Sequence, residues 1–300
     1  MDSAFDKQAN RIIDAVSLRE LEIVDHENYA CPTCSIPLIP CSYRPHNIPR
    51  PYFKEGAQKH DPECRVGDEH LNIYKKKARQ ESINTPDGFP VPFPNKLRLP
   101  VHKETVEKTG EPEIQKTYRD GMRKEVNTER SKRRHGHTTQ SILPIAQVFI
   151  DYPHDRKHLP LELPNCDGDT YASVFRPLLM NANTDLMSLY YAPLAWNSAW
   201  VTEDAIVVHL SRGEWDDEQK KFTRQFQLKV DWRSWSNKQR NALKNQIESC
   251  IKEIRKSKQK AWVFFVGRGS KEDLIMHVNN RHLLCLSTDE LIFLKPSNSS

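Results

Sequence analysis

Two pairs of metal-ligating residues near the N-terminus constrain this chain more than any other feature. Cys31 and Cys34 are separated by two residues, and His60 is separated from Cys64 by three. Two thiolates at the first spacing can face one ion from a tight turn, and a His and a Cys at the second can face it from one helical turn. Together they predict a closed, tetrahedral, structural zinc site, which has no open position for a catalytic water.

The other cysteines are assigned from their positions. Cys41 and His46 lie between the two pairs, and either could replace one of the four ligands. Seven cysteines, of which three or four are assigned to zinc, fit a reducing compartment better than a disulfide framework. Cys166, Cys250 and Cys285 occur singly, so we expect small core residues there and not nucleophiles.

The stretch around the ligands also resembles a known family. The paired cysteines, then Arg50-Pro51-Tyr52-Phe53, then His60 with Cys64, resemble the N-terminal zinc motif of CoiA-like competence proteins and related bacterial proteins of DNA uptake, mobile elements and phage defence. Lys54 stands where that family often has a further histidine. The resemblance is confined to this stretch, and it implies a role in bacterial DNA processing or defence.

Length and composition set broad limits. Three hundred residues suggest about two domains, and a mean hydropathy of −0.74 suggests that part of the chain is solvated linker. No apolar run approaches the ~18 residues that cross a bilayer, and the N-terminus lacks a signal-peptide core. We therefore expect a soluble, cytoplasmic protein with no membrane partner. The net charge of +5 permits nucleic-acid binding without requiring it.

The N-terminal half is expected to contain a module and a linker. Residues 1–83 form the zinc-binding module, in which apolar spacing predicts an amphipathic helix over residues 4–22 and a short basic helix over residues 69–81. Residues 84–140 form a Pro-rich and basic linker, with an extended connector over residues 84–100. Its cations are candidates for binding nucleic acid, namely Arg123, Lys124, Arg130, Lys132, Arg133 and Arg134.

Residues 141–300 are expected to form a second folded domain. Ser236 with Gln239 is a capping-box pattern and predicts an amphipathic helix over residues 236–258. A helix or a buried strand is expected over residues 170–180. Strands are expected over residues 145–150, 186–194, 199–210, 222–232, 261–266 and 281–286, with a polar turn over residues 212–221. The fold class is therefore α+β, with the helix packed on a mainly antiparallel sheet.

This order of elements resembles the core of restriction-like nucleases, which hold a divalent metal with acids on neighbouring strands and a nearby lysine. The resemblance implies catalytic roles for Glu203, Gln227 and Lys229, with Mg or Mn as cofactor. Sheet periodicity puts these three residues on one face, together with His209. Gln227 occupies the position of an acid, which leaves one clear carboxylate where such chemistry usually needs two.

Three functions follow from these features. The leading hypothesis is a zinc-containing nucleic-acid-binding protein, with DNA favoured over RNA, acting as an accessory factor in bacterial DNA processing or phage defence. Lys244, Lys252 and Arg255 of the helix over residues 236–258 would join the linker cations in contacting phosphates. Tyr190, Tyr191, Trp196 and Trp200 could stack on bases. The alternatives are a divergent metal-dependent nuclease and an adaptor that binds a protein partner.

Overall fold

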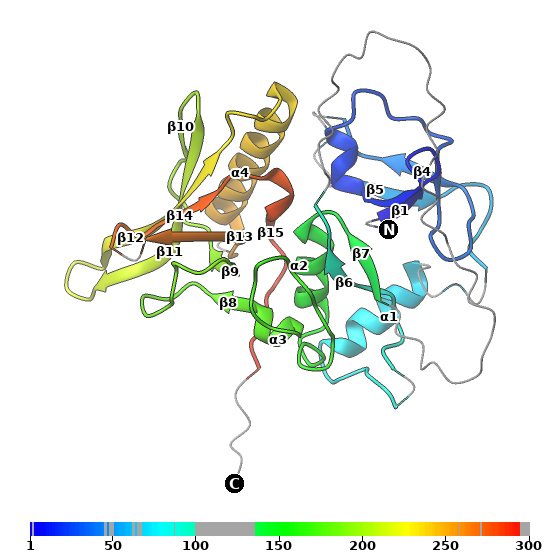
Figure 1. The fold of residues 1–300 in the computed structure, drawn as a ribbon, viewed down its shortest axis with the longest axis horizontal. Coiled ribbons are helices and arrows are strands. Elements are labelled where there is room, and N and C mark those ends of the chain that lie inside the picture. The colour runs from blue at the N-terminus through cyan, green and yellow to red at the C-terminus, as the bar shows by residue number, and fades with distance from the viewer. Residues whose placement is uncertain are drawn as a thin grey trace, which may run out of the picture.

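The computed structural model describes residues 1, 3–44, 47, 51–61, 64, 68–86, 88–99, 136–257, 259–270 and 272–294. Their fold is α+β with mostly antiparallel sheets, which confirms the predicted fold class. In Figure 1 the N-terminal strands lie on one side of the molecule and the long C-terminal strands on the other, with α2 and β15 between them. The basic part of the predicted linker lies outside the described residues.

The N-terminal module is built from short strands around a small core. Three of them form one sheet in the order β2-β1-β3, and the other two form a hairpin. The strands are β1 (Ser3–Asp6), β2 (Arg11–Asp14), β3 (Tyr29–Ala30), β4 (Leu38–Cys41) and β5 (Tyr52–Glu55). Cys31 and Cys64 are part of the same buried cluster as Leu18, Tyr29 and Phe53, so two of the four predicted metal ligands belong to the core of the module.

The predicted helix over residues 4–22 is wrong. The segment forms the β1–β2 hairpin followed by a 3-10 helix, η1 (Ala15–Arg19). The reason is the turn between the strands, where an Asp6 Oδ1 accepts a hydrogen bond from the Ala9 backbone N–H at 2.8 Å and Asn10 adopts a left-handed φ of 49°. Asp and Asn favour such turns because their side chains bond to nearby backbone groups and tolerate this conformation.

The middle of the chain folds into a layer of helices and short strands over the sheet, and the last of these strands extends the sheet itself. The Pro-rich segment is not a simple connector, because Phe89, Val91, Phe93 and Leu97 are buried in the same cluster as α2. The elements of this layer are α1 (Asp68–Ala78), β6 (Phe93–Leu97), β7 (Gly136–Thr139), α2 (Ile142–Asp151), α3 (Tyr171–Val174) and β8 (Phe175–Pro177). The observed α1 agrees with the predicted helix over residues 69–81. Within residues 170–180, where a helix or a buried strand was expected, the chain forms the helical turn α3 followed by the strand β8.

The predicted strand over residues 145–150 is also wrong, since these residues lie in helix α2. A continuous apolar run does not distinguish a buried strand from a buried helix by its periodicity. Here Ile142, Ile145, Ala146 and Phe149 are all buried, on the inner side of a helix that packs against the sheet. Pro144 is tolerated because it stands in the first turn, where no intrahelical donor is lost.

Five C-terminal strands form a partly closed barrel. Their order is β11-β12-β14-β13-β9, with β12 and β14 parallel and the other neighbours antiparallel. The strands are β9 (Ser188–Pro193), β11 (Ala205–Asp216), β12 (Lys221–Asp231), β13 (Trp262–Ser270) and β14 (Ile275–Val278). An antiparallel bridge joins Leu194 to Leu210, and the Ala195 N–H donates to the His209 carbonyl at 2.9 Å. These contacts return the end of β9 to β11 and close the ring.

Three short strands extend the barrel at its edges. They are β10 (Trp200–Val201) beside β11, β8 beside β9, and β15 (Leu284–Ser287) beside β13. The predicted strands over residues 186–194, 199–210, 222–232 and 261–266 are therefore present. The predicted turn over residues 212–221 is shorter than expected, because β11 runs on to Asp216. The predicted strand over residues 281–286 begins as a 3-10 turn, η2 (Arg281–Leu283).

Helix α4 (Asn237–Ser257) packs against the inner residues of the barrel and confirms the predicted helix. Its capping box is formed as expected, since the Gln239 N–H donates to Ser236 Oγ at 3.3 Å and the Ser236 N–H donates to Gln239 Oε1 at 3.0 Å. Leu243, Ile247 and Ile251 supply its buried stripe. The opposite face of β9 and β13 packs on α2, so the sheet separates two hydrophobic cores.

Candidate functional site

The four predicted metal ligands come together at the edge of the N-terminal core. One ligand atom from each of Cys31, Cys34, His60 and Cys64 lies within 4.8 Å of all the others. Cys31 and Cys64 are buried, whereas Cys34 and His60 are partly exposed. The cluster could therefore hold a metal ion such as zinc. Among the described residues it is the one group of three or more His, Cys, Asp or Glu side chains with this property.

The distances within the cluster fit a tetrahedral ion. Zn–S bonds of about 2.3 Å and Zn–N bonds of about 2.0–2.1 Å require S···S edges near 3.8 Å and S···N edges near 3.6 Å. The Sγ atoms of Cys31 and Cys64 are 3.7 Å apart. His60 Nδ1 lies 3.3 Å from Cys34 Sγ and 3.4 Å from Cys64 Sγ. These three separations match the spacing of ligands around one ion, and the ring nitrogen of His60 that faces the sulfurs is Nδ1.

A tight turn directs the first two thiols toward this point. The Cys31 N–H donates to the Ile36 carbonyl at 2.8 Å, and the Ser35 N–H donates to the Cys31 carbonyl at 3.0 Å. Ser35 adopts a left-handed φ of 60°, which reverses the chain after Cys34. The Thr33 N–H points at Cys31 Sγ, at 3.5 Å. A backbone N–H aimed at a sulfur stabilises the thiolate form that binds metal.

The two thiols of this turn differ in acidity. Burial alone would raise the pKa of Cys34, but hydrogen bonds from the backbone of Asp61 and Ile36 and from His60 lower it to about 6. Burial raises the pKa of Cys31. The cluster therefore combines one thiol with a lowered pKa and one with a raised pKa, and a metal charge would favour the thiolate form of both.

The remaining cysteines do not join the cluster. Cys41 Sγ donates to the Ile39 carbonyl at 3.5 Å, and the alternative ligand His46 lies outside the described residues. Cys250 and Cys285 are buried and Cys166 packs against the core, as expected for small core residues. Burial raises the pKa of Cys166 and of Cys250 to about 11, which keeps both thiols protonated.

The predicted catalytic residues lie around one face of the barrel. His209 is directly opposite Gln227, and Lys229 is opposite Val207, so these polar residues share the outer face as the periodicity predicted. Glu203 is exposed in the turn before β11, where its carbonyl accepts a hydrogen bond from Trp232 Nε1 at 3.0 Å. In the described part of the chain no carboxylate group of three or more members surrounds Lys229.

The strand register also creates a row that the sequence did not suggest. Trp200 lies opposite Val207, Val207 opposite Lys229, Lys229 beside His277, and His277 opposite Arg268. Val207, Lys229 and His277 are on the outer face, because their neighbours along each strand are barrel-interior residues. Trp200 and Arg268 are paired with members of this set and therefore share the same face. Trp200 is 68% exposed, and Lys229, His277 and Arg268 are exposed too. We call these residues the outer row.

The charges of the outer row are not neutralised nearby. Within the described residues, neither Lys229 nor Arg268 forms an ion pair. Asp231, further along β12, is bound by Arg233, whose hydrogen bond is the main reason that the pKa of Asp231 is lowered. Lys229 contributes more weakly to the same shift. The row thus combines an exposed aromatic ring with two cations and an imidazole.

The residues expected to contact nucleic acid are found in different environments. Lys244, Lys252 and Arg255 line one groove of about 410 Å³ between α4 and the β10–β11 edge. Tyr190 and Tyr191 are buried, so the prediction that they stack on bases is wrong, whereas Trp196 and Trp200 are each 68% exposed. The six linker cations lie outside the described residues, namely Arg123, Lys124, Arg130, Lys132, Arg133 and Arg134.

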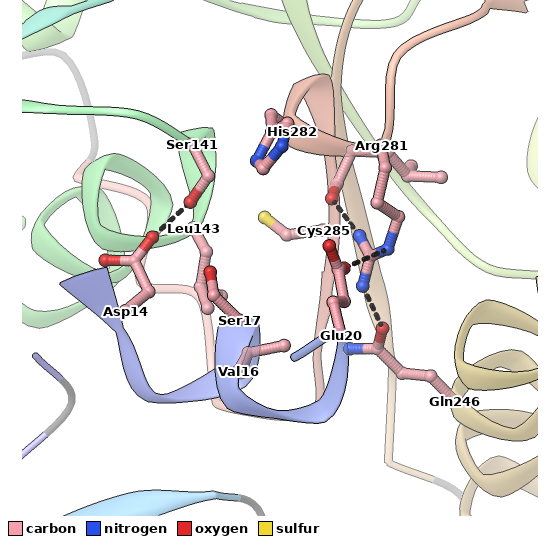
Figure 2. Close-up of a pocket in the computed structure, with 11 residues that line it drawn as sticks. Asp14, Val16, Ser17, Glu20, Ser141, Leu143, Gln246, Arg281, His282 and Cys285 are labelled. Atoms are coloured by element: carbon pink, nitrogen blue, oxygen red, sulfur yellow. Dashed lines mark hydrogen bonds and ion pairs between the residues drawn. The ribbon is translucent and has the colours of Figure 1, made fainter. Parts of the chain in front are cut away.

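A polar junction joins the N-terminal module to the barrel (Figure 2). Arg281 Nε lies 3.5 Å from Glu20 Oε1, and Arg281 Nη2 donates to Gln246 Oε1 at 3.3 Å. On the other side Ser141 Oγ donates to the Asp14 carboxylate. The cavity between these groups has about 20 Å³, which is room for about one water molecule. It is a packing junction and not a substrate site.

Comparison with known proteins adds no relative. This chain matches no family model, no curated protein and no solved structure. No helix in the described part of the chain is both long and apolar enough to cross a membrane.

Proposed function

We propose that this protein binds nucleic acid on the outer face of its barrel, and that its N-terminal cluster holds a structural Zn²⁺ ion. The observation that carries the first part is the outer row. It sets Trp200, Lys229, His277 and Arg268 on four strands of one sheet, exposed and without ion pairs among the described residues. Aromatic rings that stack on bases and cations that track phosphates are the two components of sequence-tolerant nucleic-acid sites.

The strand arrangement supports the same proposal. A five-stranded, partly open Greek-key barrel is the architecture of OB-type domains, which bind oligonucleotides on the face of strands two and three. Counted from β9 as the first strand of the barrel, β11 and β12 are the second and third. Lys229 lies on β12, and Trp200 lies on β10 beside β11. This is an argument from architecture, and the side chains of the outer row supply the chemistry.

Zinc is proposed as the metal because of the donor set. Three sulfurs and one imidazole nitrogen are ligands typical of structural zinc, and four protein ligands leave no position for a reacting water. The module that carries them packs against η2 and α4 through Glu20, Arg281 and Lys238, whose Nζ donates to the Leu21 carbonyl. The ion would therefore stabilise the module, and through it the N-terminal side of the barrel.

The nucleic-acid proposal is tested by fluorescence anisotropy with labelled single-stranded and duplex DNA and RNA over a salt series. Affinity is expected to fall with salt, with a slope in log–log form of about −0.7 to −0.9 for each phosphate neutralised. Arg268→Ala and Lys229→Ala should weaken binding and reduce that slope, and Trp200→Ala should weaken binding with little change in slope. Lys256→Ala and Trp215→Ala serve as matched controls, because both residues are exposed and outside the row. Absence of binding to every probe at low salt would refute the proposal.

A metal-dependent nuclease is the second candidate, favoured by the placing of Gln227, Lys229 and His209 on one face of the sheet. It predicts cleavage in Mg²⁺ or Mn²⁺ that is lost in both Lys229→Ala and Glu203→Gln. Binding without cleavage in the same tubes would leave a binding protein, consistent with an accessory role in DNA processing or defence. If neither binding nor cleavage occurs, the adaptor hypothesis gains weight and stoichiometric protein partners become the target.

A further inference from the structure

The groove between α4 and the β10–β11 edge is a second surface, separate from the outer row. Its floor is apolar and is formed by Ala199, Val201, Ile206 and Ile251. Ile206 and Ile251 are almost fully buried in the barrel core, whereas Val201 is 42% exposed. The volume of about 410 Å³ is within the range of about 300–1,000 Å³ found for small-molecule sites. The groove can therefore accept a flat, apolar group of the size of a nucleobase.

The rim of the groove is cationic. Lys244, Lys252 and Arg255 lie along one face of α4, against one carboxylate, Glu248. Glu248 is 4.0 Å from Lys244, so this pair is largely self-neutralised. Lys252 and Arg255 remain at the other end, where no ion pair among the described residues engages them. An anionic group would be attracted to that end.

Arg255 is held in place by the loop that precedes β10. Its Nε and Nη2 donate to the Trp196 carbonyl at 3.1 and 2.8 Å, and Nη2 is 3.5 Å from Ser198 Oγ. A guanidinium has five N–H donors, so others remain free to bond to an anion. Because the side chain is already ordered by the Trp196 carbonyl, little rotamer entropy is lost when it binds phosphate.

The two surfaces meet at strand β10. Trp200 is paired with Val207 and faces the outer row, while Val201 is paired with Ile206 and faces the groove. Consecutive residues of this strand thus point to opposite sides of the sheet. A chain of nucleotides that crosses the outer row at Trp200 would only have to round this two-residue edge strand to reach the groove.

We propose that the groove holds one unpaired nucleotide of a single-stranded nucleic acid, with its base on the apolar floor and its phosphate beside Lys252 and Arg255. The inference rests on the proposed nucleic-acid binding and adds the class of ligand. An apolar floor can contact the flat face of a base only when that base is unstacked, which a duplex does not provide. The site therefore selects single strands over duplexes.

The test uses an oligo(dT) of about ten nucleotides, within the site sizes of about 4–16 nucleotides of single-strand-binding barrels, and a duplex of equal length. Val201→Glu places a carboxylate on the floor at an exposed position, and Lys252→Glu reverses a charge on the rim. Lys256→Glu is the control, since it makes the same charge change on α4 outside the groove. Circular dichroism verifies that each variant is folded.

The expected result is preferred binding of the single strand, weakened about tenfold by Val201→Glu and by Lys252→Glu and less than threefold by Lys256→Glu. Equal affinity for duplex and single strand, or groove variants that bind like the control, would overturn the inference. In that case a loss of affinity in Arg268→Ala would leave the proposed function intact. If the unaltered protein binds no probe, the proposed function fails and the inference fails with it.

Discussion

Glu20 and Arg281, near opposite ends of the chain, form an ion pair of 3.5 Å in which the two side chains are only 15% and 10% exposed. Glu20 also accepts a hydrogen bond from Gln239 Nε2 at 3.4 Å, and Arg281 Nη1 donates to the Leu284 carbonyl at 2.9 Å. The pair thus connects the end of η1 to α4 and to η2. It is the charged centre of the contact between the N-terminal module and the barrel.

Loss of this pair is expected to destabilise the whole protein. Removing one partner of a buried ion pair leaves an uncompensated charge and typically costs about 3–5 kcal/mol. Because Glu20 retains some access to water, we expect Glu20→Gln to lower the free energy of unfolding in urea by about 3 kcal/mol. Arg224→Ala is the control, since its pair with Glu214 is nearly half exposed and is expected to be worth about 0–1 kcal/mol. Equal effects of the two substitutions would show that the junction is not energetically important.

Metal content should depend on the four clustered residues alone. Cys64→Ser and Cys34→Ser are each expected to reduce zinc, measured by elemental analysis, to well below one ion per chain. Cys41→Ser should keep full occupancy, because Cys41 lies outside the cluster. Structural zinc contributes apparent binding energies of about 10–16 kcal/mol in zinc-finger peptides, so a chelator should unfold the N-terminal module and expose it to protease. Full zinc content in Cys64→Ser would contradict this assignment.

Asp151 should make stability depend on pH. Burial raises the pKa of its carboxyl group, and Lys75 Nζ, 3.0 Å from Oδ2, opposes this shift only in part. Between the ordinary carboxyl pKa of about 3.9 and the raised value, the folded protein holds a proton that the unfolded chain has lost. The free energy of unfolding therefore falls as pH rises through this window.

The substitution Asp151→Asn is expected to flatten that dependence, as measured by urea unfolding at a series of pH values upward from about 4. Glu253→Gln, at an exposed position of α4, should leave the slope of the unaltered protein in place. If the free energy of unfolding still falls with pH in Asp151→Asn, other groups cause the pH dependence.

Gly213 should be intolerant of a side chain. It lies at an irregularity in the β11–β12 register, has a φ of +154°, and an added Cβ would meet the Arg224 carbonyl oxygen at 2.0 Å. Gly213→Ala is therefore expected to lower the free energy of unfolding by about 1–3 kcal/mol. Gly56→Ala is the control, because its Cβ would meet only Ile39, at an ordinary 3.4 Å. If both variants are equally stable, the backbone around Gly213 can move enough to accept a Cβ atom.

The sequence predicted best those features that depend on local spacing. The four clustered ligands and the capping box of α4 follow from short, regular intervals, and both occur as expected. Prediction from local spacing was wrong for two elements, the helix expected over residues 4–22 and the strand expected over residues 145–150. Asp6 and Asn10 stabilise a turn inside an apparently helical pattern, and the apolar run of α2 had no period to interpret.

The outer row could not be predicted, because it depends on which strands become neighbours. Lys229 and His277 are brought together by the parallel pairing of β12 with β14, and α4 and β13 lie between these strands in the chain. Local propensity contains no information about such a pairing. The periodicity of β12 did place Gln227 and Lys229 on one face with His209, which was the only part of this surface within reach of sequence reasoning.

The strand register of the barrel determines which sequence changes the outer row can tolerate in evolution. The outer row is assembled from five strands, each of which contributes a single side chain, so loops of any length can separate its members without moving them. A one-residue slip within β12, in contrast, would put Val230 or Leu228 in place of Lys229 and break the row at once. Relatives of this protein would therefore be expected to differ freely in loop length. They would be expected to keep the alternation of inward- and outward-facing residues along each strand.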